Sequence, residues 1–86
     1  MGRRSQTNYK RLEIIEKTYN ALFNLATKDK KNASYYLDCK IVGAQPLNGG
    51  GGWSVAILAP TRNIAAMMSI QKHVQQAVDG CTAVFV

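Results

Sequence analysis

The sequence predicts an α+β domain in which two helices pack on one face of a small three-stranded sheet. Two observations support this prediction. Apolar residues recur at helical spacing over 8–26 and again over 64–78. Three short segments with the composition and alternation of strands precede and follow the second of these stretches. The expected order of elements is therefore helix, strand, strand, helix, strand.

The first helix is expected to begin near Asn8, because Thr7 or Asn8 could cap its free backbone N–H groups. Residues 1–7 are polar and basic, so we expect a flexible tail there and a single domain over 8–86. The apolar face of this helix consists of residues at spacings of three and four: Leu12, Ile15, Tyr19, Leu22 and Ala26.

The strands are predicted over 34–42, 53–59 and 81–86. In the first strand, alternation places Tyr36 and Lys40 on the outer face of the sheet. The second strand has a less polar outer side, which indicates a central position, and it forms an antiparallel hairpin with the first. The second helix is expected to follow Pro60, with Thr61 or Asn63 as its cap and an apolar stripe of Ile64, Met67, Ile70, Val74, Ala77 and Val78.

This order of elements resembles a ferredoxin-like βαββαβ fold that lacks its first strand. The resemblance is one of topology and implies no function. Without that strand, either the second and last strands pair directly and in parallel, or a slot is left for a strand from a partner.

Four consecutive glycines connect the two strands of the hairpin. The run has no following Lys and no following helix, so it does not match a phosphate-binding loop. We expect a mobile hairpin tip, because glycine is costly to order. The alternative is a loop that orders on a partner, with Trp53 either as its anchor or as a core residue. This possible contact loop comprises Asn48, Gly49, Gly50, Gly51, Gly52 and Trp53.

Catalysis and cofactor binding are not indicated by the sequence. His73 is the single histidine, and Ser69, one helical turn before it, has no carboxylate placed to complete a triad. One histidine and two distant cysteines do not form a familiar zinc set. We expect Cys39 and Cys81 to be buried, unpaired thiols in a reducing compartment. The chain is therefore predicted to be neither an enzyme nor a holder of metal or cofactor.

The strongest functional signal is a net charge of +6, with most basic residues in the amino-terminal half. Lysine and arginine side chains can neutralise phosphates and release counterions, and aromatic rings can stack on unpaired bases. The predicted nucleic-acid-binding residues are Arg3, Arg4, Lys10, Arg11, Lys17, Lys30, Lys31, Tyr36 and Lys40.

We therefore expect a small basic module that contacts nucleic acid, or a nucleic-acid-handling complex. Two other functions stay open: a viral or phage accessory or inhibitor protein that acts by protein–protein binding, and a homo-oligomeric structural protein. The expected partners are nucleic acid or an acidic protein surface, with a possible homodimer and no membrane. Because no secretory signal or long apolar run is present, the expected location is cytoplasmic, or nuclear in a eukaryotic host, and not secreted.

Overall fold

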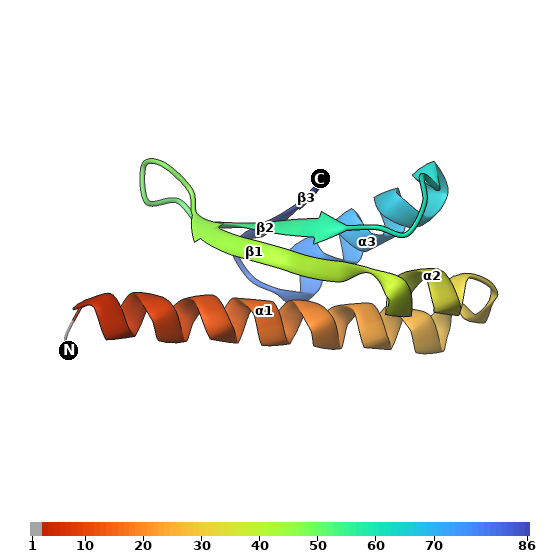
Figure 1. Ribbon diagram of the computed structural model, residues 1–86, viewed down its shortest axis with the longest axis horizontal. Helices are drawn as coiled ribbons and strands as arrows, with labels where there is room; N and C mark the ends of the chain where they lie inside the picture. Colours follow the sequence, from red (N-terminus) through yellow and green to blue (C-terminus); the bar gives the residue numbers. More distant parts are fainter. Residues whose placement is uncertain (1–2) are drawn as a thin grey trace.

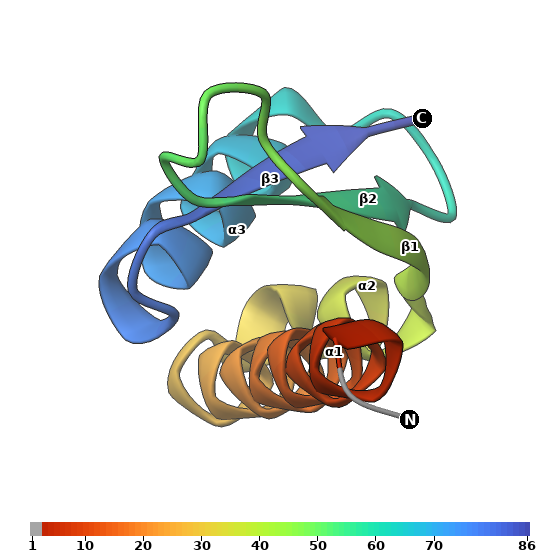
Figure 2. The same cartoon turned by 90° about the vertical axis from the view of Figure 1, so that its left-hand side faces the viewer.

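The computed structural model describes the backbone of residues 3–86 and the side chains from Asn8 onward. It is an α+β structure with a mixed three-stranded sheet and helices packed on one face of it (Figures 1 and 2). The expected order is confirmed, with one short helix added before the first strand. The elements are α1 Arg3–Lys28, the 3-10 turn η1 Lys30–Asn32, α2 Ala33–Asp38, β1 Lys40–Pro46, β2 Trp53–Leu58, α3 Ile64–Ala77 and β3 Cys81–Phe85.

The sheet has the order β1-β2-β3, so β2 is central as predicted. β1 pairs with β2 in an antiparallel hairpin, and the register shifts between Ile41 and Gly43. β2 and β3 pair directly and in parallel, with Val55 opposite Ala83. Of the two arrangements expected for the absent strand, the direct parallel pairing is the one that forms.

Helix α1 begins at Arg3, earlier than expected, so residues 3–7 belong to the helix by their backbone. Residues 1 and 2 of the predicted tail lie outside the described residues. The buried face of α1 agrees with the predicted one only in part. Leu22 and Ala26 are buried as predicted, and Ile15 packs against the core. Ile14, Thr18 and Ala21 are buried as well, whereas Leu12 and Tyr19 are exposed. The Thr18 hydroxyl donates to the carbonyl of Ile14 at 2.8 Å, which satisfies this polar group inside the core.

The segment predicted as the first strand is mostly helical. Residues 33–38 form α2, and the strand begins only at Lys40. The alternation over 34–42 was therefore misleading. α2 instead turns Tyr36 inward, where its exposure is 1%, and leaves Leu37 on the surface. The prediction that Tyr36 lies on an outer sheet face is wrong.

Helix α3 follows its sequence signals closely. The Asn63 side chain caps it by accepting a hydrogen bond from Ala66 N–H at 3.1 Å. Gly80 has a φ of +73° just before β3, as expected for the residue that closes a helix end. The buried stripe consists of Ala66, Ile70, Val74 and Val78. Ile64 and Ala77, which were predicted to belong to it, are exposed.

The core lies between the inner face of the sheet and the two long helices (Figure 2). Val55 and Ile57 of the central strand are fully buried there, next to Ile70 of α3 and Ile14 of α1. The cysteines are both buried and unpaired, which confirms that part of the prediction. None of the helices within residues 3–86 combines the length and apolar character needed to cross a membrane.

Helix side chains cover backbone groups on both free edges of the sheet. On the β1 edge, Arg11 Nε donates to the Ala44 carbonyl at 2.9 Å, and Ile41 N–H donates to the Tyr19 hydroxyl at 3.0 Å. On the β3 edge, Gln71 Nε2 donates to the Ala83 carbonyl at 3.3 Å. These bonds occupy groups that could otherwise pair with another strand.

Candidate binding surfaces

The exposed lysines of α1 form a row on one flank of the helix. Lys10, Lys17 and Lys28 are separated by seven and eleven residues, which is close to whole numbers of helical turns. Glu13 lies beside this row, with its carboxylate 3.5 Å from Lys17 Nζ and 3.9 Å from Lys10 Nζ. Exposed pairs of this kind bind weakly, so both ammonium groups stay available to an anion in solution.

Arg11 was predicted to bind nucleic acid, but its guanidinium already has two protein partners. Besides Ala44, it donates to the Asn8 side chain at 3.1 Å. The side chain is half-buried against the edge of β1. Its main observed role is therefore to hold α1 against the sheet.

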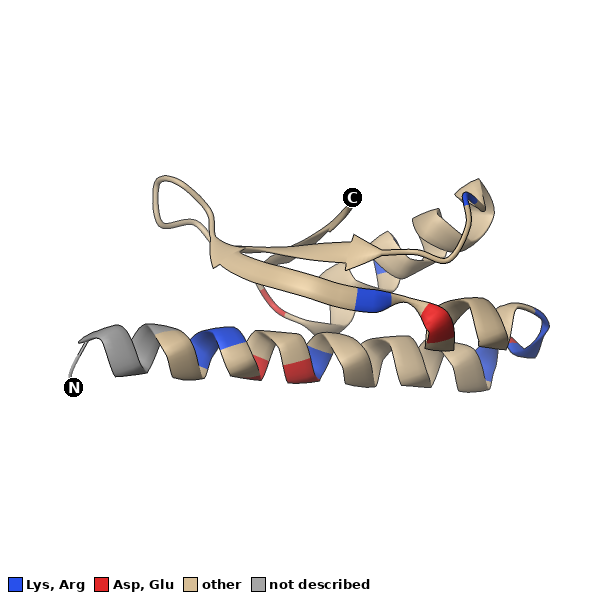
Figure 3. Cartoon of the chain, in the orientation of Figure 1, with Lys and Arg blue, Asp and Glu red and all other residues tan. Residues whose placement is uncertain are grey.

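The remaining basic residues of the predicted set do not form one cluster. Lys30 and Lys31 lie in η1, at the far end of α1 from Lys10, and Lys40 lies on β1 (Figure 3). All three are exposed. The side chains of Arg3 and Arg4 lie outside the described residues. The structure thus brings together Lys10 and Lys17, and it separates them from Lys30 and Lys31 along an elongated molecule 44 Å in length.

Tyr36 is removed from the surface by a polar contact that joins α2 to the end of α1. Its hydroxyl donates to Asp29 Oδ2 at 2.6 Å, and Asn32 Nδ2 donates to the same oxygen at 3.0 Å. These bonds lower the pKa of Asp29, since they favour its charged form. Burial, followed by the bond to Asp29, raises the pKa of Tyr36. A ring in this position cannot stack on a base.

The glycine run forms the connection of the β1–β2 hairpin, as predicted. Leu47 N–H donates to the Gly52 carbonyl at 2.8 Å, and Gly50 N–H donates to the Leu47 carbonyl at 3.2 Å. Trp53 is half-buried against the core. Its backbone N–H donates to the Gly80 carbonyl at 2.8 Å. The exposed part of the predicted contact loop is therefore limited to 48–51, whose side chains offer one amide and no charge.

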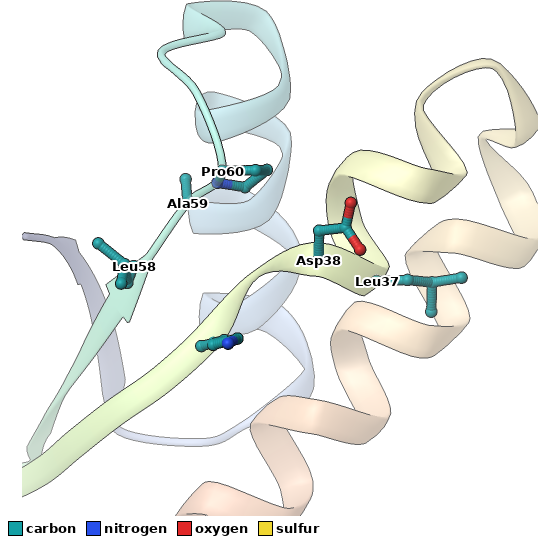
Figure 4. A pocket seen from close by; sticks show the side chains of 6 residues that line it. Leu37, Asp38, Leu58, Ala59 and Pro60 are labelled. Carbon is teal, nitrogen blue, oxygen red and sulfur yellow. The ribbon is translucent and has the colours of Figure 1, made fainter.

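Apolar side chains line two adjoining hollows beside the β1 edge. The larger, with a volume of about 590 Å³, lies between the end of α2 and the end of β2 (Figure 4). The smaller, of about 250 Å³, lies between Tyr19 and Phe23 of α1 and Leu37 of α2. Leu37 belongs to both hollows. The residues that line the larger one are Leu37, Asp38, Lys40, Leu58, Ala59 and Pro60.

These apolar residues were missed as surface features by reasoning from the sequence. The exposed apolar residues of α1 and α2 that line the hollows are Tyr19, Phe23 and Leu37, which keep 43%, 59% and 57% of their surface. A usable signal was present in α1, where more apolar residues occur over 12–26 than one buried face can hold.

The described side chains contain no group of residues arranged for acid–base or nucleophilic catalysis. His73 lies in α3, and its Nε2 is buried without a hydrogen-bond partner. Burial and, to a lesser degree, the charge of Lys28 lower its pKa. Burial, followed by the charge of Asp38, raises the pKa of Cys39 to about 11, so this thiol is a poor nucleophile. From Asn8 onward, no three His, Cys, Asp or Glu side chains gather as they would around a metal ion.

No protein-family model matches the chain, and the comparisons with curated proteins and with solved structures found no match either.

Proposed function

We propose that the chain is a non-catalytic binding module that contacts nucleic acid, or a nucleic-acid-handling complex, through the amino-terminal half of α1. The observation that carries this proposal is the charge of a helix end that extends past the sheet (Figure 1). The first twelve residues contain Arg3, Arg4, Lys10 and Arg11 and no acidic residue. The helix dipole adds positive potential at the same end.

The proposed contact is with phosphates, without base reading. Lys10 and Lys17 are exposed on the same flank, and Arg3 and Arg4 add charge to the same end of the chain. Since Tyr36 is buried and Arg11 is bonded to the sheet, the site has less to offer to base edges than the sequence suggested. Affinity should therefore depend weakly on base sequence and strongly on ionic strength.

The test is the salt dependence of binding to a fluorescent duplex and to a fluorescent single strand. For duplex DNA, the logarithm of the affinity should fall by about 0.9 for each unit of log salt and each phosphate neutralised. The double substitution Lys10→Glu, Lys17→Glu should weaken binding about tenfold or more and reduce this slope. The double substitution Arg62→Glu, Lys72→Glu makes the same change in net charge at exposed positions outside α1, so it is the matched control and should change binding little.

Two results would contradict the proposal. The first is absence of binding even at low salt. The second is binding that both charge-reversal variants alter equally, because the site on α1 would then have no special role.

A second candidate is an accessory or inhibitor protein that acts by protein–protein binding. It is favoured by the hollow of about 590 Å³, where Leu37, Leu58 and Pro60 present apolar surface beside Asp38 and Lys40. Recovery of a host protein by the wild type and not by Leu58→Asp would support it. Equal recovery by both would place the contact elsewhere.

We also propose that the fold is a ferredoxin-like arrangement without its first strand. The support is the hairpin followed by a helix and a parallel strand, with the long helices on one face of the sheet. A cytoplasmic or nuclear location remains a prediction from the sequence.

A further inference from the structure

One flank of α1 presents large apolar side chains to solvent. Leu12, Tyr19 and Phe23 follow one another at spacings of seven and four residues, so they share this flank, and Tyr9 precedes Leu12 by one turn. The exposed Glu16 lies among them, four residues after Leu12 and seven before Phe23, so the flank also carries one carboxylate. The exposed fractions of the side chains are 72% for Tyr9, 62% for Leu12, 43% for Tyr19 and 59% for Phe23. The lysine row of Lys10 and Lys17 lies on the opposite flank. A helix on the surface of a globular protein normally has polar side chains on its solvent-facing side, so this flank is unusual.

The two ends of this flank differ in shape. At the carboxyl end, Tyr19 and Phe23 border the hollow of about 250 Å³, which Leu37 of α2 closes on its other side. At the amino end, Leu12 and Tyr9 keep 62% and 72% of their surface exposed, although the neighbouring Arg11 is bonded to Ala44 of β1. One end of the flank therefore has a depression and the other end has protruding side chains.

We propose that the occupant of this flank is a second copy of the chain, packed with its α1 antiparallel to the first. A two-fold axis midway between Leu12 and Phe23 places Leu12 of each copy beside Phe23 of the other and next to the hollow that Leu37 borders. The contact is isologous, because the same patch serves both copies and the assembly closes at two. This inference goes beyond the proposed contact with phosphates, since the lysine row remains free on the opposite flank.

The area available matches a weak dimer. A fully buried aromatic side chain covers about 150–250 Å², so the exposed parts of Tyr9, Tyr19 and Phe23 supply roughly 350 Å² per copy. A fully buried leucine side chain covers about 100 Å², so the exposed parts of Leu12 and Leu37 add roughly 60 Å² each. Two copies would then bury roughly 950 Å², which is near the lower limit of about 1,000 Å² for a specific interface. We therefore expect monomer and dimer to exchange.

Salt should have opposite effects on this dimer and on nucleic-acid binding. Each copy has a net charge of +6, so two copies repel each other over long distances, and salt screens that repulsion. The proposed dimer should therefore strengthen with added salt, whereas binding to phosphates should weaken. This difference lets one proposal fail without the other.

Sedimentation velocity over micromolar to millimolar protein concentrations tests the dimer. Leu12→Ser and Phe23→Ser should each raise the dissociation constant about tenfold, the change that a loss of about 1.4 kcal/mol produces. Met68→Ser removes an equally exposed apolar side chain from α3 and should leave the dissociation constant unchanged. Far-UV circular dichroism checks that each variant is folded. A monomer at all concentrations, or a dimer unaffected by both α1 substitutions, would overturn the proposal.

Cysteine cross-linking tests the orientation. A mixture of Leu12→Cys and Phe23→Cys chains should form a disulfide between the two variants under mild oxidation. Leu12→Cys alone should not, because its two thiols would be separated by about 16 Å along antiparallel helices, at 1.5 Å per residue. Because Cys39 lines the same hollow as Phe23, both native cysteines are replaced by alanine in the chains used for cross-linking. Efficient cross-linking of Leu12→Cys to itself would show a parallel pair and overturn the antiparallel arrangement.

Discussion

The Tyr36 hydroxyl donates a hydrogen bond of 2.6 Å to the carboxylate of Asp29, seven residues earlier in the chain. This bond links α2 to the turn that follows α1, and it forms in the helical arrangement of a segment with strand-like alternation. With its ring buried and its hydroxyl satisfied, Tyr36 has a structural role in this fold.

Tyr36→Phe should lower the free energy of unfolding by about 1–2 kcal/mol, because it removes a hydrogen bond to a charged group. Urea denaturation followed by circular dichroism measures the change. Tyr35→Phe is the matched control: the Tyr35 hydroxyl donates to the Thr61 carbonyl at 2.6 Å in an exposed position, where water can replace it. An equal loss in both variants would show that the Asp29 carboxylate adds nothing.

Acid should weaken the fold through Asp29. The folded-state pKa of this carboxyl is lowered, chiefly by the hydrogen bond from Tyr36, so its contribution is present above the ordinary value near 4. The contribution is lost as the pH falls through the lower folded pKa. In Asp29→Asn, the urea concentration at which half of the protein is unfolded should therefore change less with pH below about 4 than in the wild type. The same pH dependence in both chains would contradict this assignment.

His73 should make stability depend on pH in a higher window. Burial and the charge of Lys28 lower its pKa in the folded state, while the unfolded chain titrates near 6.5. Between these two values the unfolded state binds more protons, so the free energy of unfolding falls as the pH decreases through about 6. His73→Gln should flatten the stability profile as the pH falls below about 7. A profile that keeps the wild-type slope would assign that slope to other groups.

Two neighbouring glycines of the hairpin should respond differently to alanine. At Gly52, φ is +135° and a Cβ atom would overlap the Gly80 carbonyl oxygen. Gly52→Ala should therefore cost about 2–3 kcal/mol of unfolding free energy, through backbone strain and displacement of the β2–β3 junction. At Gly51, a Cβ atom meets nothing within 4 Å, so Gly51→Ala should be neutral or slightly stabilising. Thermal denaturation of the two variants decides this, and equal melting temperatures would show that the tight approach of Gly52 to Gly80 is unimportant.

The two thiols should be unreactive in the folded protein. Burial raises the pKa of Cys39 to about 11 and also raises the pKa of Cys81. At pH 8, Ellman's reagent should label them slowly in buffer and completely after denaturation, because the thiolate is the reactive form. Rapid reaction of one of the two thiols with the reagent in buffer would contradict this and would show that the folded protein opens readily around that cysteine.

The elements that the sequence predicts well are those in which several local signals agree. α3 has Pro60 and Asn63 before it and Gly80 after it, and its apolar spacing matches its buried stripe at Ile70 and Val74. Its start and its end could therefore be predicted without knowledge of the rest of the fold. The hairpin is likewise predictable, because the glycine run separates two apolar segments.

The parts that could not be predicted depend on contacts between distant residues. In α1, the series from Leu12 to Ala26 and the series through Ile14, Thr18 and Ala21 both have helical spacing, and the polar Thr18 conceals the second one. Packing against the sheet buries the second series together with Leu22 and Ala26 of the first, and leaves Leu12 and Tyr19 exposed. The basic residues of the proposed site are visible in the sequence, but the hydrogen bond of Arg11 to Ala44 spans 33 residues and cannot be inferred from spacing.

The covered strand edges have a consequence for how copies of this molecule can associate. Arg11, Tyr19 and Gln71 occupy backbone groups that would otherwise template the addition of further strands. Growth into ribbons or amyloid-like fibrils is therefore opposed by three side chains that sit on helices. Loss of any one of them would free a backbone group at a strand edge for pairing with another chain.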